Sequence, residues 1–171
     1  MEVIRVYTDG SSSSNGKKNC LSGCGVYFLD QDVGLSLSSQ EACDKCSFTL
    51  EGHSNNVGEL LGILVALYHV TDKTRELVIH SDSMYCINAI TVWHHNWATR
   101  GWITAGGTPV KNKNLIKRIL DEKKKFKGVF FKHVKGHALE PEDKTSEKWR
   151  DWYGNDQADK LATGSVHGRV S

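Results

Sequence analysis

Residues 3–11, VIRVYTDGS, decide how the rest of the chain is interpreted. The first five residues are mostly apolar and rich in β-branched side chains, a composition that favours a strand. Thr8-Asp9-Gly10-Ser11 then leads into a stretch rich in Ser, Gly and Asn that continues through Gly16 and predicts a loop. The segment therefore predicts a first strand that ends at a carboxylate, Asp9.

Working outward from this strand, the same local signals predict the other elements of the chain. Further strands are expected at residues 24–29, 46–50, 76–82 and 128–134, with 35–39 extending or interrupting the first hairpin. Helices are expected at residues 57–67, 84–90, 114–127 and 155–163. Strands that come first and then alternate with helices favour an α/β fold with a mixed sheet. We expect five strands, the first three antiparallel, flanked by helices on both faces in a single domain over residues 1–171.

The composition is typical of a soluble globular protein, with 39% apolar and 25% charged residues in a chain of 171. No stretch approaches the roughly 18 apolar residues that a membrane helix needs. The N-terminus lacks the basic start and the apolar run of a secretory signal. We therefore expect an intracellular protein, cytoplasmic or nuclear, with no membrane partner.

The net charge of +2 permits nucleic-acid binding but does not argue for it. Residues 111–135 are rich in lysine and arginine and contain two acids, Asp121 and Glu122. A solvated helix face explains such a run as well as a phosphate-binding surface does.

Five cysteines in a chain without a signal sequence favour reduced thiols. The spacings Cys20-x3-Cys24 and Cys43-x2-Cys46 are also found in zinc sites. If Cys24 and Cys46 each begin a strand of one antiparallel hairpin, however, the two pairs lie at opposite ends of it. Isolated thiols are the preferred interpretation, and zinc binding is the alternative.

Four acidic residues are candidates for one site. Asp9 ends the first predicted strand and Asp82 ends the fourth, so both emerge at one edge if the strands are neighbours. Glu59 lies in the first turn or so of the central helix, and Asp159 lies on the last predicted helix. Converging carboxylates repel one another, and hard cations such as Mg²⁺ or Mn²⁺ remove that cost. For each residue alone, a helix cap or a solvated side chain is the alternative.

Five segments, in this order, resemble the successive motifs of type 1 ribonuclease H. They are YTDGS at 7–11, Asn55-Asn56 before Glu59, SDS at 81–83, VKGHA at 134–138 and GNDQADKLA at 154–162. The resemblance covers almost the whole chain, from about Val3 to about Gly164, and implies a ribonuclease H-like fold. It also implies an endonuclease that hydrolyses the RNA strand of an RNA–DNA hybrid with two Mg²⁺ ions, Mn²⁺ being the alternative. The implied products carry 3′-hydroxyl and 5′-phosphate ends.

Matching motif to motif, the resemblance assigns the metal-binding carboxylates to Asp9, Glu59, Asp82 and Asp159. The family's last ligand directly precedes the Lys-Leu-Ala segment, so Asp159 is preferred and Asp156 is the outer residue. His137 matches a mobile histidine of the family, for which a role in proton movement or product release is implied.

The resemblance also implies an aromatic surface for the DNA strand. Residues 93–112 are similar to the protruding handle of the family, where Trp93 and Trp97 would line the groove. Tyr85, three residues after Asp82, would line it as well. A place in the protein core is the alternative for these aromatic side chains.

Polar contacts to the substrate are implied at two places. Asn112 and Ser54 match residues that hold a DNA phosphate. Short amides suit base edges and sugar hydroxyls in the minor groove, where the 2′-OH distinguishes RNA from DNA. The residues that match those positions are Asn15, Asn55 and Asn56.

The chain departs from the family pattern in three ways. The handle carries Ala98-Thr99-Arg100 and Ile103 where relatives are often richer in lysine, which predicts weaker binding and a shallower salt dependence. Gly52 stands where animal-type relatives place an arginine in the phosphate pocket. His137 and Asp159 are 22 positions apart (159 − 137), about twice the usual spacing. The extra segment, 139–153, would be a flexible flap, an added helical turn or a cover over the site.

Other functions stay open at this point. The ribonuclease H portion of a reverse transcriptase would carry the same motifs, and a non-catalytic hybrid-binding module would share the fold. A complete set of acids argues against the module, because binding a polyanion gives no reason to cluster acids beside it. A recombinase or resolvase of the same superfamily would not be expected to carry the handle and the VKGHA segment. As partner we expect an RNA–DNA hybrid, bound by a monomer.

Overall fold

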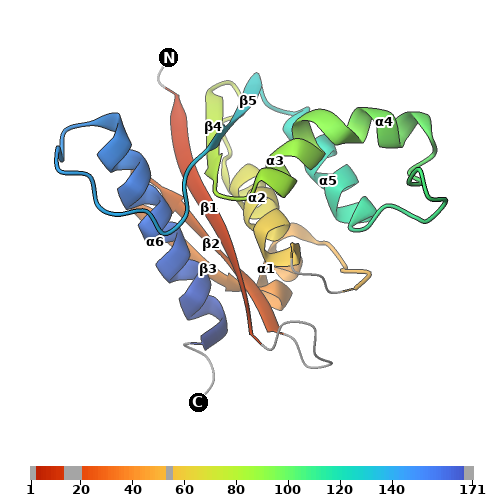
Figure 1. Ribbon diagram of the computed structural model, residues 1–171, viewed down its shortest axis with the longest axis horizontal. Coiled ribbons are helices and arrows are strands. Elements are labelled where there is room, and N and C mark those ends of the chain that lie inside the picture. The colour runs from red at the N-terminus through yellow and green to blue at the C-terminus, as the bar shows by residue number, and fades with distance from the viewer. Residues whose placement is uncertain (1–2, 14–20, 53–55, 168–171) are drawn as a thin grey trace.

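A five-stranded mixed sheet forms the centre of the molecule, in the order β3-β2-β1-β4-β5 (Figure 1). The computed structural model describes residues 3–13, 21–52 and 56–167. β1 pairs with β2 and β2 with β3 in antiparallel orientation, whereas β4 runs parallel to β1 and β5 parallel to β4. The expected sheet is therefore confirmed. Its strands are β1 Ile4–Ser13, β2 Leu21–Phe28, β3 Val33–Ser38, β4 Glu76–Ser81 and β5 Gly128–His133.

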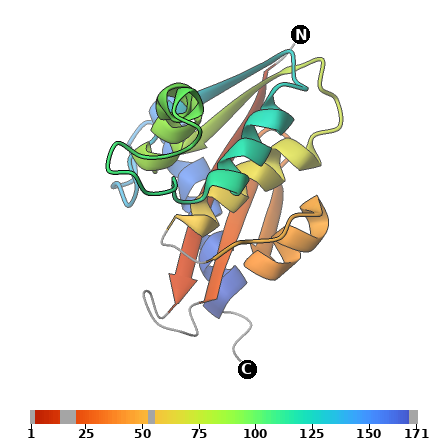
Figure 2. The ribbon, with the colours of Figure 1, turned by 90° about the vertical axis from the view of Figure 1, so that its right-hand side faces the viewer.

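Helices cover both faces of the sheet, as expected (Figures 1 and 2). The long helix α6, Glu147–His167, packs on β1, β2 and β3 from one side. On the other side α2, Val57–His69, packs on β1 and β2 and contacts α1, Ser39–Cys46, and α5, Lys113–Lys123. The remaining helices lead away from β4 toward the projection formed by α4: α3 Met84–Asn88, a π-helical turn η1 Ala89–Trp93, and α4 His94–Thr99.

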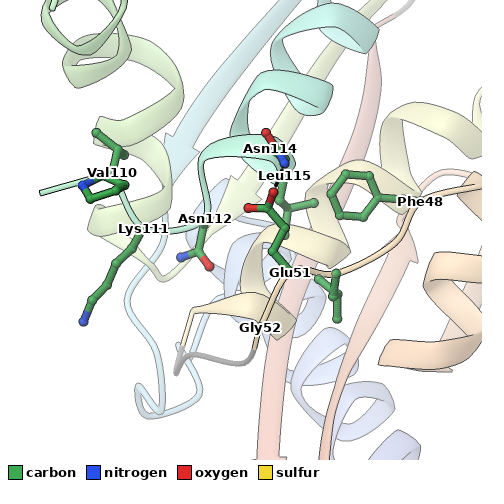
Figure 3. Close-up of a pocket in the computed structure, with 10 residues that line it drawn as sticks. Phe48, Glu51, Gly52, Val110, Lys111, Asn112, Asn114 and Leu115 are labelled. Carbon is green, nitrogen blue, oxygen red and sulfur yellow. Dashed lines mark hydrogen bonds between the residues drawn. The ribbon is translucent and has the colours of Figure 1, made fainter. Parts of the chain in front are cut away.

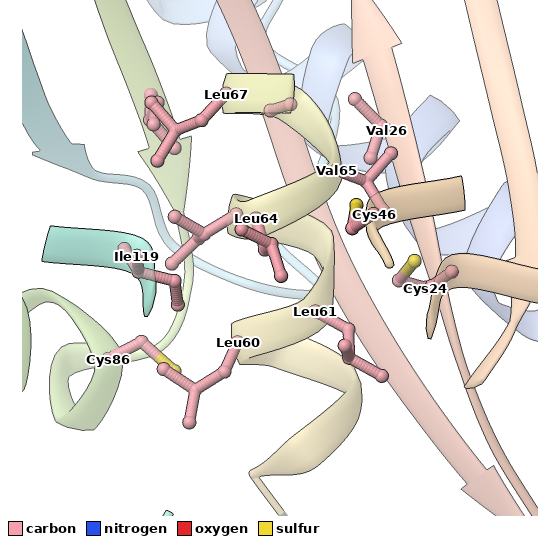
Figure 4. Packing of buried hydrophobic residues seen from close by; sticks show 14 of the residues in the cluster. Cys24, Val26, Cys46, Leu60, Leu61, Leu64, Val65, Leu67, Cys86 and Ile119 are labelled. Atoms are coloured by element: carbon pink, nitrogen blue, oxygen red, sulfur yellow. The ribbon is translucent and has the colours of Figure 1, made fainter. Parts of the chain in front are cut away.

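The main core surrounds α2, whose side chains are buried on nearly every face (Figure 4). Leu60, Leu61 and Leu64 are fully buried, and burying each stabilises the fold by roughly 1.5–3 kcal/mol. At its N-terminal end the helix approaches β1 so closely that a Cβ on Gly10 would collide with the backbone of Gly58 and Glu59. Glycine at position 10 therefore lets the start of α2 lie directly against β1.

The predicted third strand at residues 46–50 is wrong. The chain forms β3 earlier, at Val33–Ser38, and then turns into α1. A capping box starts this helix: Glu41 N donates to Ser38 Oγ at 3.2 Å, and Ser38 N donates to Glu41 Oε1 at 2.9 Å. The capping box thus starts a helix that runs through Cys46, and residues 47–50 follow it without forming a strand.

The argument that placed the cysteine pairs at opposite ends of a hairpin is also wrong. Cys46 ends α1 instead of starting a strand, and it lies on the same side of α2 as Cys24 (Figure 4). Cys24, Cys43, Cys46 and Cys86 are free thiols buried in the core. Burial raises the pKa of Cys24, and the neighbouring Cys46 and Cys43 raise it further. These thiols are therefore packed as small apolar side chains.

Two element boundaries differ from expectation in ways that affect the site. β1 continues through Ser13, so Asp9 lies inside a paired strand and not at its end. α6 begins at Glu147, eight positions before the expected start at Asn155 (155 − 147). Ser146 Oγ accepts a hydrogen bond from Trp149 N at 3.0 Å and so caps the start of the helix. For residues 147–153, the second half of the segment 139–153, the alternative of an added helical turn is therefore confirmed.

Within the described part of the chain, no helix is both long enough and apolar enough to cross a membrane.

Candidate active site

Three acidic side chains meet where β1, β4 and α2 come together. In the parallel pairing of β1 and β4, Tyr7 is opposite His80, which places Asp9 level with Asp82 two residues further on. The close approach of α2 to Gly10 brings Glu59 to the same point. One carboxylate oxygen from each of Asp9, Glu59 and Asp82 lies within 4.8 Å of the other two.

Burial makes this cluster electrostatically unfavourable when all three groups are charged. Asp9 is only 4% exposed. Burial raises the pKa of Asp9 far above its usual range, and the charges of Glu59 and Asp82 raise it further. Burial and the charge of Asp82 also raise the pKa of Glu59. Burial and the charge of Asp159 raise the pKa of Asp82.

The cluster has little compensation for its negative charge among the described residues. None of its three acids forms an ion pair with a lysine or arginine there. Glu59 Oε2 is buried without a hydrogen-bond partner in the same part of the chain. Asp9 Oδ1 accepts one bond, from Gly10 N at 2.9 Å. Three hard oxygen donors so arranged match the ligand preference of a divalent cation.

The structure brings Asp159 and His137 to the same place. A small pocket of about 30 Å³ opens beside Asp82, and α6 and the loop after β5 form its other walls. Asp156, treated in the sequence as the outer acid, pairs with Lys160 at 2.9 Å. The residues that line the pocket are Asp82, His137, Ala138, Trp152, Asn155, Asp156 and Asp159.

The loop that carries His137 passes very close to Asp82. A Cβ on Gly136 would lie 2.7 Å from Asp82 Oδ2, so any larger residue there would push the Asp82 carboxylate aside. His137 itself adopts a left-handed backbone with φ 54°, which is uncommon for a residue other than glycine. The backbone of the loop thus turns sharply where it reaches the acids.

The aromatic residues expected to bind DNA form a connected row. The rings of Tyr85 and Trp93 meet edge to face with centroids 5.8 Å apart, and those of Trp93 and Trp97 are 5.9 Å apart. Trp97 and Tyr85 are partly buried against the main core, whereas Trp93 is 37% exposed. Both interpretations of these residues therefore have a structural counterpart: Tyr85 and Trp97 contribute to the core, and Trp93 offers an accessible surface.

Asn112 lies in the wall of a larger pocket of about 340 Å³, between residues 48–52 and 109–115 (Figure 3). Its Nδ2 donates to Tyr85 Oη at 3.4 Å, which links the pocket to the aromatic row. Gly52 lines the pocket, and a Cβ there would meet nothing within 4 Å. Asn114 donates to Glu51 across the pocket. A carboxylate thus lies close to the position where the family pattern led us to expect an arginine.

Of the other residues expected to contact the substrate, only Asn56 is among the described residues. Asn15, Ser54 and Asn55 lie outside the described residues. Asn56 directly precedes α2, and its side chain makes no capping hydrogen bond. The predictions for these four residues stay predictions.

Sequence reasoning missed two residues that line the acidic pocket, Trp152 and Asn155. Both precede Asp159 on α6, by seven and four positions, and therefore lie on the same helical face. This spacing could have revealed Asn155 within the predicted helix at 155–163, and Trp152 only if the helix had been predicted to start earlier.

Comparisons with known proteins agree with this geometry. The chain is 36% identical over 160 residues to a ribonuclease H of Schizosaccharomyces pombe, covering 92% of this chain and 50% of that protein. It is 33% identical over 148 residues to a ribonuclease H of a Shewanella strain, covering 86% of this chain and 85% of that protein. The chain thus spans about half the length of the S. pombe relative and most of the bacterial one.

Solved structures share the fold at lower identity. The solution structure of the PFV RNase H domain matches with a TM-score of 0.66 at 22% identity, covering 96% of this chain and 94% of that one. A foamy viral protease-reverse transcriptase in complex with an RNA/DNA hybrid matches with a TM-score of 0.70 at 20% identity, covering 96% of this chain and 20% of that one. The model of the RNase H family matches residues 1–167. With that match over nearly its whole length, the chain belongs to the RNase H family.

Proposed function

We propose that the chain is an endoribonuclease that hydrolyses the RNA strand of RNA–DNA hybrids. The observation that carries this proposal is the group formed by the buried Asp9 and the partly buried Glu59 and Asp82, which each bring one oxygen within 4.8 Å of the other two. Membership of the RNase H family and relatives named ribonuclease H support it. The hybrid seen with one structural neighbour supports the choice of substrate.

Divalent cations fit this group of acids. The raised pKa values of Asp9 and Glu59, which follow from burial and mutual repulsion, mark a site where positive charge is missing. The buried, unpartnered Glu59 Oε2 offers a ligand atom. Two bound cations, Mg²⁺ or alternatively Mn²⁺, would supply a nucleophilic water and neutralise the leaving oxygen of the phosphodiester. Asp9 would help to hold both cations, Glu59 and Asp82 would help to hold one of them, and Asp159 the other.

The protein's own contribution is positioning and charge. The four carboxylates come from β1, α2, the end of β4 and α6, so packing of the whole fold fixes their separation. His137, in the wall of the same pocket, would assist proton movement at the departing 3′ oxygen or product release. No covalent intermediate is required, and the products would carry 3′-hydroxyl and 5′-phosphate ends.

Tyr85, Trp93, Trp97 and Asn112 are proposed to hold the DNA strand. Trp93 offers the exposed ring of the aromatic row. Asn112 connects this row to the pocket beside Glu51, where we place a backbone phosphate (Figure 3). Glu51 and the open space at Gly52 weaken that phosphate site, so the salt dependence of binding should be shallow.

Matched duplexes test the proposal. The protein is incubated with RNA–DNA, RNA–RNA and DNA–DNA duplexes of one sequence, with Mg²⁺ and with EDTA. We expect loss of RNA from the hybrid alone, and only with the metal. No cleavage of any duplex would contradict the proposal and favour a binding module.

Asp82→Asn tests the metal assignment. It removes one ligand charge while keeping the side-chain shape, so hybrid cleavage should fall by at least about 100-fold. Fold and hybrid binding, checked by circular dichroism and by a gel-shift assay, should be preserved. Asp44→Asn, the same change at an exposed position on α1, is the control and should cleave normally. Full activity of Asp82→Asn in Mg²⁺ would overturn the assignment.

Three further expectations stay predictions: a single domain over residues 1–171, a monomer, and an intracellular location. The ribonuclease H portion of a longer reverse transcriptase would give the same result with these duplexes. This alternative differs only in the longer protein to which the chain would belong, and the proposed reaction is the same.

A further inference from the structure

The first turns of α6, residues 147–153, are fixed to the sheet by a network of polar contacts. Asp151 accepts a hydrogen bond from Tyr7 Oη at 2.6 Å and one from Lys132 Nζ at 2.6 Å. Lys132 Nζ also reaches Glu147 at 3.0 Å. These contacts join α6 to β1, which carries Asp9, and to β5, which leads into the loop of His137, so this part of the helix has a fixed place relative to both.

Two tryptophans of this segment differ in what their indole N–H groups do. Trp152 Nε1 donates to the backbone carbonyl of Ala138 at 3.0 Å. Trp149 stacks on Tyr153, with ring centroids 5.0 Å apart at an angle of 12°. Its Nε1 is buried and has no hydrogen-bond partner in the described part of the chain. One indole therefore reaches the loop after β5, and the other only packs.

The carbonyl that Trp152 holds belongs to the residue directly after His137. Trp152 and His137 line the same pocket as Asp82 and Asp159. Trp152 and Ala138 also line a neighbouring pocket of about 200 Å³ with Leu139, so the indole lies between the loop and the helix. On its other side the loop is confined by the contact of Gly136 with Asp82. The left-handed backbone of His137 is thus held between two fixed points.

We propose that Trp152 is a positioning residue that sets the place of His137 through its hydrogen bond to Ala138. The inference rests on the proposed function, because the task of His137 is defined by hybrid cleavage. The hydrogen bond thereby ties the loop after His137 to α6. The additional turns of α6 at residues 147–153 serve to hold this loop beside the acids.

Trp152→Phe and Trp149→Phe form a matched pair of variants. Each removes one indole N–H and keeps an aromatic ring on the same helix. Loss of the bond to Ala138 should lower kcat for hybrid cleavage by about three- to ten-fold, with KM within about two-fold of wild type. Trp149→Phe should leave kcat unchanged, because its N–H makes no bond. Equal kcat values for the two variants would overturn the proposal.

A double-mutant cycle with His137→Ala separates positioning from general loss of structure. If Trp152 acts through His137, Trp152→Phe should change kcat by less than about two-fold in the His137→Ala background. The same fold-loss in both backgrounds would show that Trp152 acts by another route and would contradict the inference.

Backbone ¹⁵N relaxation of residues 136–139 provides a readout that does not depend on activity. In the wild-type protein these amides should have order parameters near those of rigid backbone, about 0.85. Values below about 0.6 would exclude a positioned loop. The wild-type protein could leave hybrids intact and still have a rigid loop that becomes mobile in Trp152→Phe. That result would contradict the proposed function but would support the role of Trp152 in positioning the loop.

Discussion

Asp9 is the residue at which folding and function conflict most directly. It is nearly inaccessible, it lies inside a paired strand, and two further carboxylates are close by. Its pKa is raised by burial and by the charges of Glu59 and Asp82, so ionising it in the folded protein costs free energy. The unfolded chain does not have this cost.

Asp9→Asn should therefore stabilise the metal-free protein while inactivating it. At pH 8 the unfolded chain releases the proton that the buried Asp9 retains, which favours unfolding, and asparagine has no such proton to release. The substitution should therefore raise the free energy of unfolding at pH 8 by about 2 kcal/mol, an increase in Tm of about 4–8 °C. Thermal denaturation in EDTA measures this. Asp44→Asn, on the exposed side of α1, is the control and should leave Tm unchanged. A lower Tm for Asp9→Asn would show that its carboxylate is stabilised by contacts other than a cation.

At the scale of elements, α6 depends on glycine at its contacts with the sheet. Gly154 is buried, and a Cβ there would collide with the ring of Tyr7. Gly164, nearer the end of the same helix, is exposed, and a Cβ there would approach only Ser36 Oγ, at 3.9 Å. A substitution at Gly154 therefore tests the packing of α6 on the sheet, whereas one at Gly164 tests helix propensity alone.

Gly154→Ala should destabilise the protein by about 1–3 kcal/mol, because α6 must move away from β1. Gly164→Ala should stabilise it by about 0.5–1 kcal/mol, because alanine favours the helix. Urea denaturation of both variants gives the two free energies. Changes of the same sign would mean that α6 is not packed as closely on Tyr7 as described.

The elements that the sequence predicted well are those with strong local signals. The apolar helix at 57–67 and the strands at 76–82 and 128–134 all form close to their expected ranges. The strand expected at 46–50 failed because three apolar residues in the alternating stretch CSFTL are only a weak strand signal, and the first of them, Cys46, ends α1. The capping box of Ser38 and Glu41 was present in the sequence and would have predicted α1.

The early start of α6 was harder to predict. Residues 147–153 owe their place to the bonds of Asp151 with Tyr7 and Lys132, which are far apart in the sequence. A local pattern carries no information about such partners. The four carboxylates, in contrast, could be named from their motifs, although their meeting point follows only from the parallel pairing of β1 and β4.

At the scale of the whole molecule, cation binding should couple stability to pH. Carboxyl groups with a raised pKa retain protons in the folded protein that the unfolded chain releases. A cation that binds the ionised groups must displace these protons, so its affinity falls as the pH falls. The stabilisation by Mg²⁺ should therefore grow from pH 6 to pH 8.

Calorimetric titration with Mg²⁺ at several pH values measures this coupling. The Kd should decrease with rising pH by up to about tenfold per unit, as expected for one displaced proton. Burial lowers the pKa of His80, which affects stability with and without the cation, so comparing Tm in Mg²⁺ and in EDTA at each pH removes most of its contribution. A Kd that does not change between pH 6 and pH 8 would contradict the assignment of the cations to these acids.

The position of Asp159 on the last helix has a consequence for synthesis of the protein in the cell. Asp9, Glu59 and Asp82 are translated early, but α6 follows all five strands in the chain. A nascent or prematurely terminated chain that ends before residue 147 would lack both the fourth carboxylate and the helix that covers one face of the sheet. Under the proposed function, nuclease activity would thus begin only after translation has passed α6, and truncated products would leave hybrids uncut.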